Sequence, residues 1–112
     1  MRSDPKKLLY DVATAAAAIR GFCEGRSLQD YENNLMLRSA CERQFEIIGE
    51  AMTRLRDRHA PVFAQLGDGP VIIAFRHRII HGYDTVDPEL VWDVIVTKLP
   101  QLQEAAEALL QK

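Results

Sequence analysis

The sequence is poor in the features that mark secreted and membrane proteins. Its 112 residues contain two cysteines, too few for the disulfide framework of a small secreted domain. No apolar run approaches the roughly 18 residues of a membrane span, and no apolar segment of a signal peptide follows the first residues. We therefore expect a cytoplasmic protein without a membrane partner, in which Cys23 and Cys41 stay reduced and pack as small apolar side chains.

The chain also lacks an overall basic charge, since its formal net charge is −2. The charge is uneven, however: residues 36–83 hold seven arginines and five carboxylates, whereas residues 84–112 hold two lysines and six carboxylates. Arginine is the side chain best shaped for phosphate, so a local basic patch is one interpretation. Pairing of these arginines with neighbouring glutamates on solvated helix faces is equally compatible with the charges.

No segment has a convincing strand pattern, and the apolar residues recur at helical spacing. Asp4 and Pro5 form a capping start, Asn33 and Asn34 can interrupt the second helix, and Pro100 should kink or break the last. A short turn is expected within residues 62–66. The predicted helices cover residues 5–24, 27–58 (with a start at Ser27 or Asp30), 70–80 and 88–112.

The long second helix carries an apolar seam of nearly heptad spacing, which suits an antiparallel bundle or a dimer interface. Its members are Leu37, Cys41, Phe45, Ile48, Met52 and Leu55. Gly49 lies inside this helix, where glycine costs about 1 kcal/mol relative to alanine, so we expect a tight crossing with another backbone there. These features predict a single all-α domain over residues 1–112, an antiparallel bundle of four to five helices.

Residues 70–84 combine apolar and titratable side chains more densely than any other stretch. His77 and His81 lie one helical turn apart and could bind zinc, but a site needs a third or fourth ligand. Asp84 and His59 are the nearest candidates, and no HExxH pattern is present. We therefore predict no metal site and no cofactor.

Metal-free cleavage of RNA is the alternative chemistry for this segment. An imidazole can take the proton of a ribose 2′-hydroxyl, and a guanidinium can hold the scissile phosphate. Arg76 and His81 lie about 140° apart on a regular helix, but a helix that stops at Gly82 would let them converge. From residue types alone, a plain structural bundle with solvated arginines and a helix-end histidine remains open.

Two motifs give the chain a resemblance to a known family. Arg76-His77-Arg78-Ile79-Ile80-His81 matches the Arg-polar-x-x-x-His pattern of HEPN ribonucleases, and Tyr83 extends it to Arg-x4-His-x-Tyr. The stretch Ile47-Ile48-Gly49-Glu50-Ala51 is similar to the preceding long helix of the HepT-like group. In length and helix order, the resemblance to HepT-like toxins covers nearly the whole chain.

The resemblance implies a HEPN bundle that dimerises, or forms a higher even oligomer, so that two motifs share one cleft. The activity would be a metal-independent endoribonuclease leaving a 2′,3′-cyclic phosphate, with Arg76 and His81 as the catalytic pair. His77 stands where asparagine is most common in the family, so an orienting role is expected of it. Arg54, Arg58 and Arg78 are candidate RNA-binding residues.

The resemblance also implies partners. The protein would be the toxin of a type VII-like toxin–antitoxin system that cleaves tRNA or mRNA rather than DNA. A minimal nucleotidyltransferase antitoxin would neutralise it, and AMP transfer to Tyr83 is one route. The alternative is a non-catalytic HEPN module that docks a nucleotidyltransferase or holds a nucleotide.

Overall fold

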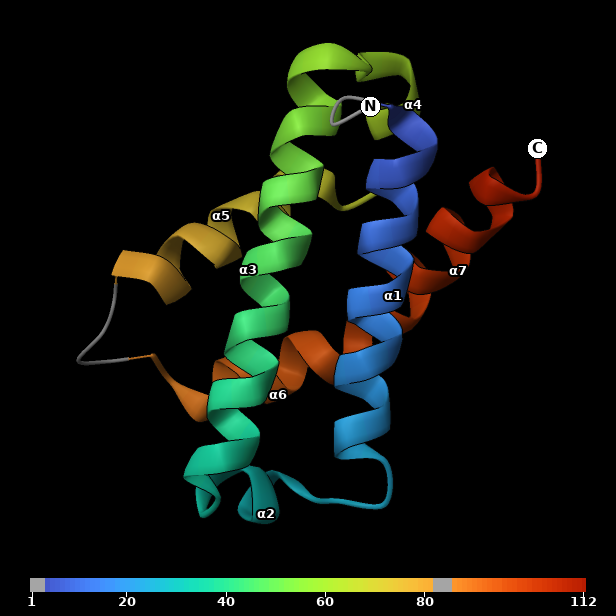
Figure 1. Ribbon diagram of the computed structural model, residues 1–112. Coiled ribbons are helices and arrows are strands. Elements are labelled where there is room, and N and C mark those ends of the chain that lie inside the picture. The colour runs from blue at the N-terminus through green and yellow to red at the C-terminus, as the bar shows by residue number, and fades with distance from the viewer. Residues whose placement is uncertain (1–3, 82–85) are drawn as a thin grey trace.

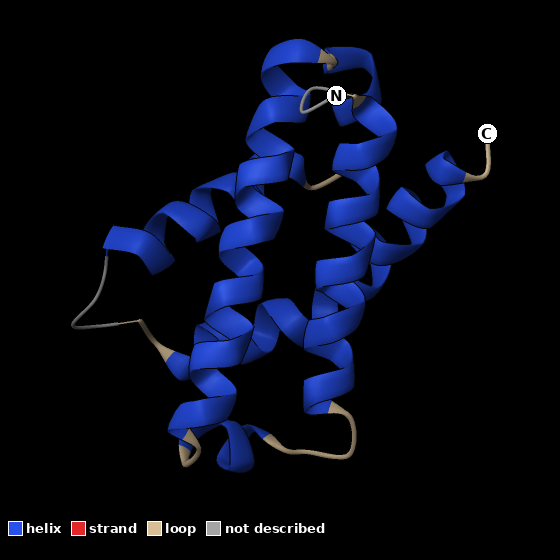
Figure 2. Ribbon diagram, in the orientation of Figure 1, coloured by secondary structure: helices blue, strands red, loops and turns tan. Residues whose placement is uncertain are grey.

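The computed structural model describes residues 4–81 and 86–112, without the side chains of Ile80 and His81. These residues form helices and connecting loops, as Figure 2 shows. The prediction of an all-α bundle is confirmed, with five longer helices and two five-residue helices, α2 and α4. The elements are α1 (Pro5–Cys23), α2 (Leu28–Glu32), α3 (Leu35–Arg58), α4 (Ala60–Ala64), α5 (Gly69–His81), α6 (Pro88–Thr97) and α7 (Leu99–Leu110).

Helices α1 and α3 run antiparallel side by side through the centre of the molecule (Figure 1). Helix α7 packs along α1, α5 crosses α3, and α6 contacts α2 and α7. The predicted start of α1 is confirmed, because the Asp4 carboxylate accepts a hydrogen bond from the Lys6 backbone N–H at 2.9 Å and Pro5 follows it.

Short polar residues and proline divide the chain where the sequence predicts. Ser27 and Asp30 form a capping box that begins α2, and Asn34 caps α3 by accepting from the Leu37 N–H at 3.0 Å. Pro100 lies in the first turn of α7, where its missing N–H is tolerated. The expected turn at residues 62–66 overlaps the end of helix α4, which stops at Ala64. Helix α5 extends through His81, and Gly82 lies outside the described residues.

The predicted apolar seam of α3 forms one side of the core. All six of its members are buried, together with residues from α1, α5, α6 and α7. The Tyr31 ring packs against Trp92, with ring centroids 5.8 Å apart, which joins α2 to α6. Burial of this continuous apolar surface is the main source of fold stability.

The two cysteines lie within the core, between α1 and α3. Cys23 and Cys41 are free thiols with their Sγ atoms 3.7 Å apart. Desolvation raises the pKa of both thiols, and it also raises the pKa of the buried Tyr31 hydroxyl. The cysteines therefore pack as small apolar side chains, as predicted.

Within residues 4–81 and 86–112, no helix is both long enough and apolar enough to span a membrane.

Candidate functional site

Arg76 lies on α5 at the edge of the face that packs against the bundle. Its neighbour Phe75 is buried and meets Phe45 of α3 edge-to-face, with ring centroids 4.9 Å apart. Ile72 and Ile79, on the same face, are also buried. These contacts fix α5 on α3 and place Arg76 beside the polar margin of α3.

Gly49 makes room for the Arg76 side chain. A Cβ atom built on Gly49 would lie 2.1 Å from Cγ and 2.4 Å from Cβ of Arg76. The predicted tight contact at Gly49 therefore exists, but its nearest atoms belong to a side chain rather than to another backbone. The apolar stem of arginine packs well on such a surface while its charged end reaches the pocket.

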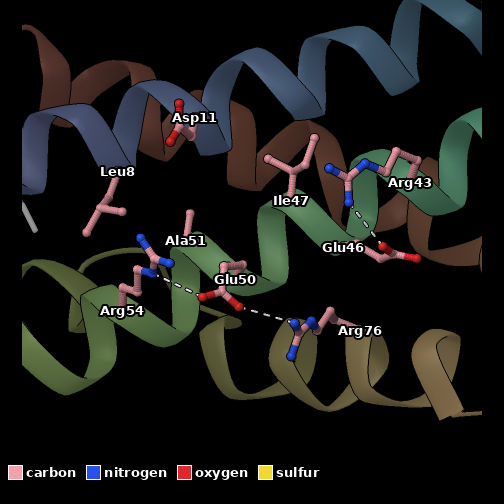
Figure 3. Close-up of a pocket in the computed structure, with 9 residues that line it drawn as sticks. All are labelled: Leu8, Asp11, Arg43, Glu46, Ile47, Glu50, Ala51, Arg54 and Arg76. Carbon is pink, nitrogen blue, oxygen red and sulfur yellow. Dashed lines mark hydrogen bonds and ion pairs between the residues drawn. The ribbon is translucent and has the colours of Figure 1, made fainter. Parts of the chain in front are cut away.

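Glu50 forms an ion-pair bridge between two arginines (Figure 3). Arg76 donates from Nη2 to Glu50 Oε1 at 3.2 Å, and Arg54 donates from Nε to Glu50 Oε2 at 3.0 Å. The Arg76 side chain is 25% exposed and that of Glu50 is 49% exposed. The bridge therefore lies at the surface, where solvent can reach it.

The bridge forms part of the wall of an open pocket of about 260 Å³. Three arginines and three carboxylates stand around this pocket, and Arg43 pairs there with Glu46 at 3.2 Å. Its lining residues are Leu8, Asp11, Arg43, Glu46, Ile47, Glu50, Ala51, Arg54 and Arg76. An anion entering the pocket would meet guanidinium groups whose charge is already partly balanced.

The Arg76 guanidinium is unequally satisfied. Nη2 is bonded to Glu50, but Nε is buried and has no hydrogen-bond partner among the described residues. A buried N–H without an acceptor costs free energy, so this placement of Arg76 reduces the stability of the fold.

Comparison with known proteins identifies the family. The family described as Ribonuclease HepT-like matches residues 12–109. The chain belongs to this family. The match includes α5 with Arg76 and the α3 stretch that holds Gly49 and Glu50.

Three relatives match this chain over most of its length and of their own. A proposed RNase from Methanocaldococcus jannaschii is 27% identical over 95% of this chain and 96% of its own. A proposed RNase from Caldanaerobacter subterraneus subsp. tengcongensis is 31% identical over 80% of this chain and 79% of its own. A probable ribonuclease HepT from Thermococcus cleftensis is 26% identical over 97% and 98%. No solved structure matches the chain.

The HepT-like motif residues are only partly described. Arg76 is placed in the pocket wall, and His81 is the last residue of α5, but the His81 side chain is not described. Gly82 and Tyr83 lie outside the described residues. The convergence of Arg76 with His81 remains a prediction.

The other predicted residues of the HepT-like site are distributed over two helices. Arg54 lines the pocket with Arg76. His77 and Arg78 are exposed on α5, and Arg58 is exposed at the C-terminal end of α3; none of these three is among the lining residues of this pocket. Their predicted roles remain predictions.

His77 and His81 of this HepT-like chain have the sequence spacing of a metal-binding pair. Among the described residues, no group of three His, Cys, Asp or Glu side chains could hold a metal ion.

Sequence reasoning missed Glu50 as a partner of Arg76. The two residues are separated by 26 positions, so no local spacing rule connects them. The available signal was the five-residue HepT-like stretch around Gly49, in which Glu50 directly follows the glycine.

Proposed function

We propose that the protein is a metal-independent endoribonuclease that cleaves RNA in the cytoplasm by internal transesterification. Arg76 binds the scissile phosphate and stabilises its developing negative charge. His81 acts as the general base on the ribose 2′-hydroxyl.

The reaction exchanges one phosphate ester bond for another. His81 accepts the proton of the 2′-hydroxyl, the 2′-oxygen bonds to phosphorus, and the bond from phosphorus to the 5′-oxygen breaks. A histidine of a second copy donates a proton to the leaving 5′-oxygen. The products are a 2′,3′-cyclic phosphate and a free 5′-hydroxyl.

The position of Arg76 is the observation that carries this proposal. The residue that matches the family motif borders an open pocket beside Arg54, and Glu50 uses one of its guanidinium donors. A phosphate oxygen would be attracted by both guanidinium groups and could accept from the Arg76 donors that Glu50 leaves unused. The composite site of two copies is proposed from the resemblance to HEPN proteins.

The direct test is cleavage of a labelled RNA by the purified protein in EDTA. We expect a cyclic-phosphate product, and a rate lower by about 10²–10³-fold in Arg76→Ala and in His81→Ala. RNA that stays intact with the folded wild type, or activity that survives both substitutions, would contradict the proposal. RNA binding should weaken with salt, because phosphate contacts release counterions.

We further propose that this ribonuclease is a toxin neutralised by a minimal nucleotidyltransferase antitoxin. Transfer of AMP to Tyr83 would add a bulky anion two residues beyond His81 and would compete with RNA for the cationic groups. Incubation with the antitoxin and ATP should increase the intact mass by one AMP. An unchanged mass, or an equal gain in Tyr83→Phe, would count against modification at this residue.

A second candidate is a non-catalytic module that docks a nucleotidyltransferase or a nucleotide. The acidic C-terminal region favours it, because Glu104 and Glu107 are exposed on α7 and could meet a basic partner. A stable complex with the nucleotidyltransferase, together with intact RNA in the cleavage assay, would select this candidate.

A further inference from the structure

We propose that Glu50 is a positioning residue that orients the Arg76 guanidinium for phosphate binding. As a statement about catalysis, this inference rests on the proposed ribonuclease function. It adds a residue from a different helix to the motif on α5.

Arg76 is a long side chain that needs external constraints to hold one orientation. Its stem lies over Gly49, at distances that leave no room for a β-carbon there. Its end is bonded to Glu50 through Nη2 at 3.2 Å. One contact fixes the stem and the other fixes the direction of the guanidinium, which together prearrange it before substrate arrives.

Arg54 holds Glu50 in the bridging position. Arg54 and Glu50 are one helical turn apart on α3, and their 3.0 Å bond uses the carboxylate oxygen that Arg76 does not use. Glu50 engages one of the five N–H donors of Arg76, so other donors remain for a phosphate. Glu50 therefore restrains Arg76 without occupying its whole hydrogen-bonding edge.

Glu46 offers a matched control. It lies one turn before Glu50 on α3, borders the same pocket, and pairs with Arg43 at 3.2 Å. It carries the same charge as Glu50, but it forms an ion pair with Arg43, whereas Glu50 pairs with Arg76. Removing either carboxylate makes the pocket more positive, whereas only the loss of Glu50 should release Arg76.

The opposite interpretation is that Glu50 competes with phosphate for Arg76. Kinetics separate the two. If Glu50 competes with phosphate, its removal should lower KM and leave kcat equal or higher. If Glu50 positions Arg76, its removal should lower kcat, even when the added positive charge improves RNA binding.

The test compares Glu50→Ala, Glu50→Gln and Glu46→Ala on the same RNA. We expect kcat to fall about tenfold in Glu50→Ala with KM equal or lower, because a displaced guanidinium no longer matches the transition state. Glu50→Gln keeps an acceptor oxygen at the same reach and should recover a large part of the loss, while Glu46→Ala, which leaves the ion pair of Arg76 with Glu50 in place, should lower kcat much less than Glu50→Ala does. An unchanged or higher kcat in Glu50→Ala, or an equal fall in Glu46→Ala, would overturn the inference.

A second readout does not depend on cleavage. The Arg76 Nε–H is buried, so its NMR signal, assigned with Arg76→Lys, should exchange slowly with water in the wild type and fast in Glu50→Ala. Equal exchange in both would refute positioning by Glu50. If the wild type cleaves no RNA but the exchange difference is present, the proposed function fails and the structural role of Glu50 stands.

Discussion

Helix α3 has two contact regions of opposite character. Toward α1 it forms a dry seam in which Cys23, Cys41 and Ile19 are buried among apolar side chains. Toward α5 it forms the crossing where Gly49 and Glu50 meet Arg76, and there the charged ends reach solvent. We call these regions the α1–α3 seam and the α3–α5 crossing.

The α1–α3 seam serves the stability of the fold, whereas the α3–α5 crossing serves the proposed chemistry. The seam excludes water and stabilises the fold through apolar burial. The crossing accepts a glycine inside a helix and a buried guanidinium Nε without a partner among the described residues, and both cost stability. Such local costs are typical of functional sites, so substitutions in the two regions should change different measurements.

The largest expected effect on stability is at the seam. Ile19→Ala removes a fully buried side chain of α1 and should lower the free energy of unfolding by about 2–5 kcal/mol. Denaturant unfolding followed by circular dichroism measures this. RNA cleavage per folded molecule should not change. A loss of cleavage without a loss of stability would contradict the claim that the seam serves stability alone.

The crossing is tested by Gly49→Ala. The added methyl group would overlap the Arg76 stem and must displace it, so cleavage should fall about ten- to hundredfold. The higher helix propensity of alanine, about 1 kcal/mol, offsets part of the strain in the free energy of unfolding.

Gly21→Ala is the matched control for this substitution. Gly21 also lies within a helix, but a Cβ there would meet nothing within 4 Å. It should raise the free energy of unfolding by up to about 1 kcal/mol and leave cleavage unchanged. Equal cleavage by both variants would show that Arg76 does not need the space at Gly49.

Alkaline pH should weaken the seam. Burial raises the pKa of the Cys41 thiol, so the folded state holds this proton more tightly than the unfolded state does. Stability is then complete below the unfolded pKa of about 8.5 and falls above it, by at most about 1.4 kcal/mol per pH unit for one thiol. The free energy of unfolding should therefore depend less on pH across this range in Cys41→Ala than in the wild type. An equal pH dependence in the two proteins would contradict the raised pKa of Cys41.

The smallest expected effect is at Glu42, beside the seam. Desolvation raises the pKa of its carboxyl, and Arg38 opposes that shift. The charged form is therefore disfavoured in the folded state, and Glu42→Gln should be more stable at pH 7 by no more than about 0.5 kcal/mol, since solvent screens this half-buried group. At pH 3 the stability difference between Glu42→Gln and the wild type should disappear. A larger difference at pH 3 than at pH 7 would contradict the raised pKa of Glu42.

Local sequence rules predicted most of the fold. Asp4, Asn34 and Pro100 determine where helices begin, through hydrogen bonds and a missing N–H that act within one turn. The apolar row of α3 was predicted from residue spacing on that helix alone. These features depend on neighbours in the sequence, which is why they could be read without the structure.

The site was less predictable because its contacts join distant residues. Gly49 indicated a close approach, but only the structure identifies Arg76 as the group that fills the space. The bridge from Arg54 through Glu50 to Arg76 depends on how α5 is docked by the Phe45–Phe75 contact. Family resemblance supplied Arg76 and His81 as a pair, which residue types alone did not decide.

Measuring stability and RNA cleavage together tests most directly whether the α1–α3 seam serves stability and the α3–α5 crossing serves chemistry. The free energy of unfolding and the rate of RNA cleavage are determined on the same preparations of wild type, Ile19→Ala and Arg76→Lys. The account predicts that Ile19→Ala loses stability and keeps cleavage per folded molecule. It predicts that Arg76→Lys keeps its stability within about 0.5 kcal/mol but cleaves at least about tenfold more slowly, because lysine lacks the planar fork of donors. Full cleavage by Arg76→Lys, or a loss of stability that accounts for its loss of cleavage, would contradict it.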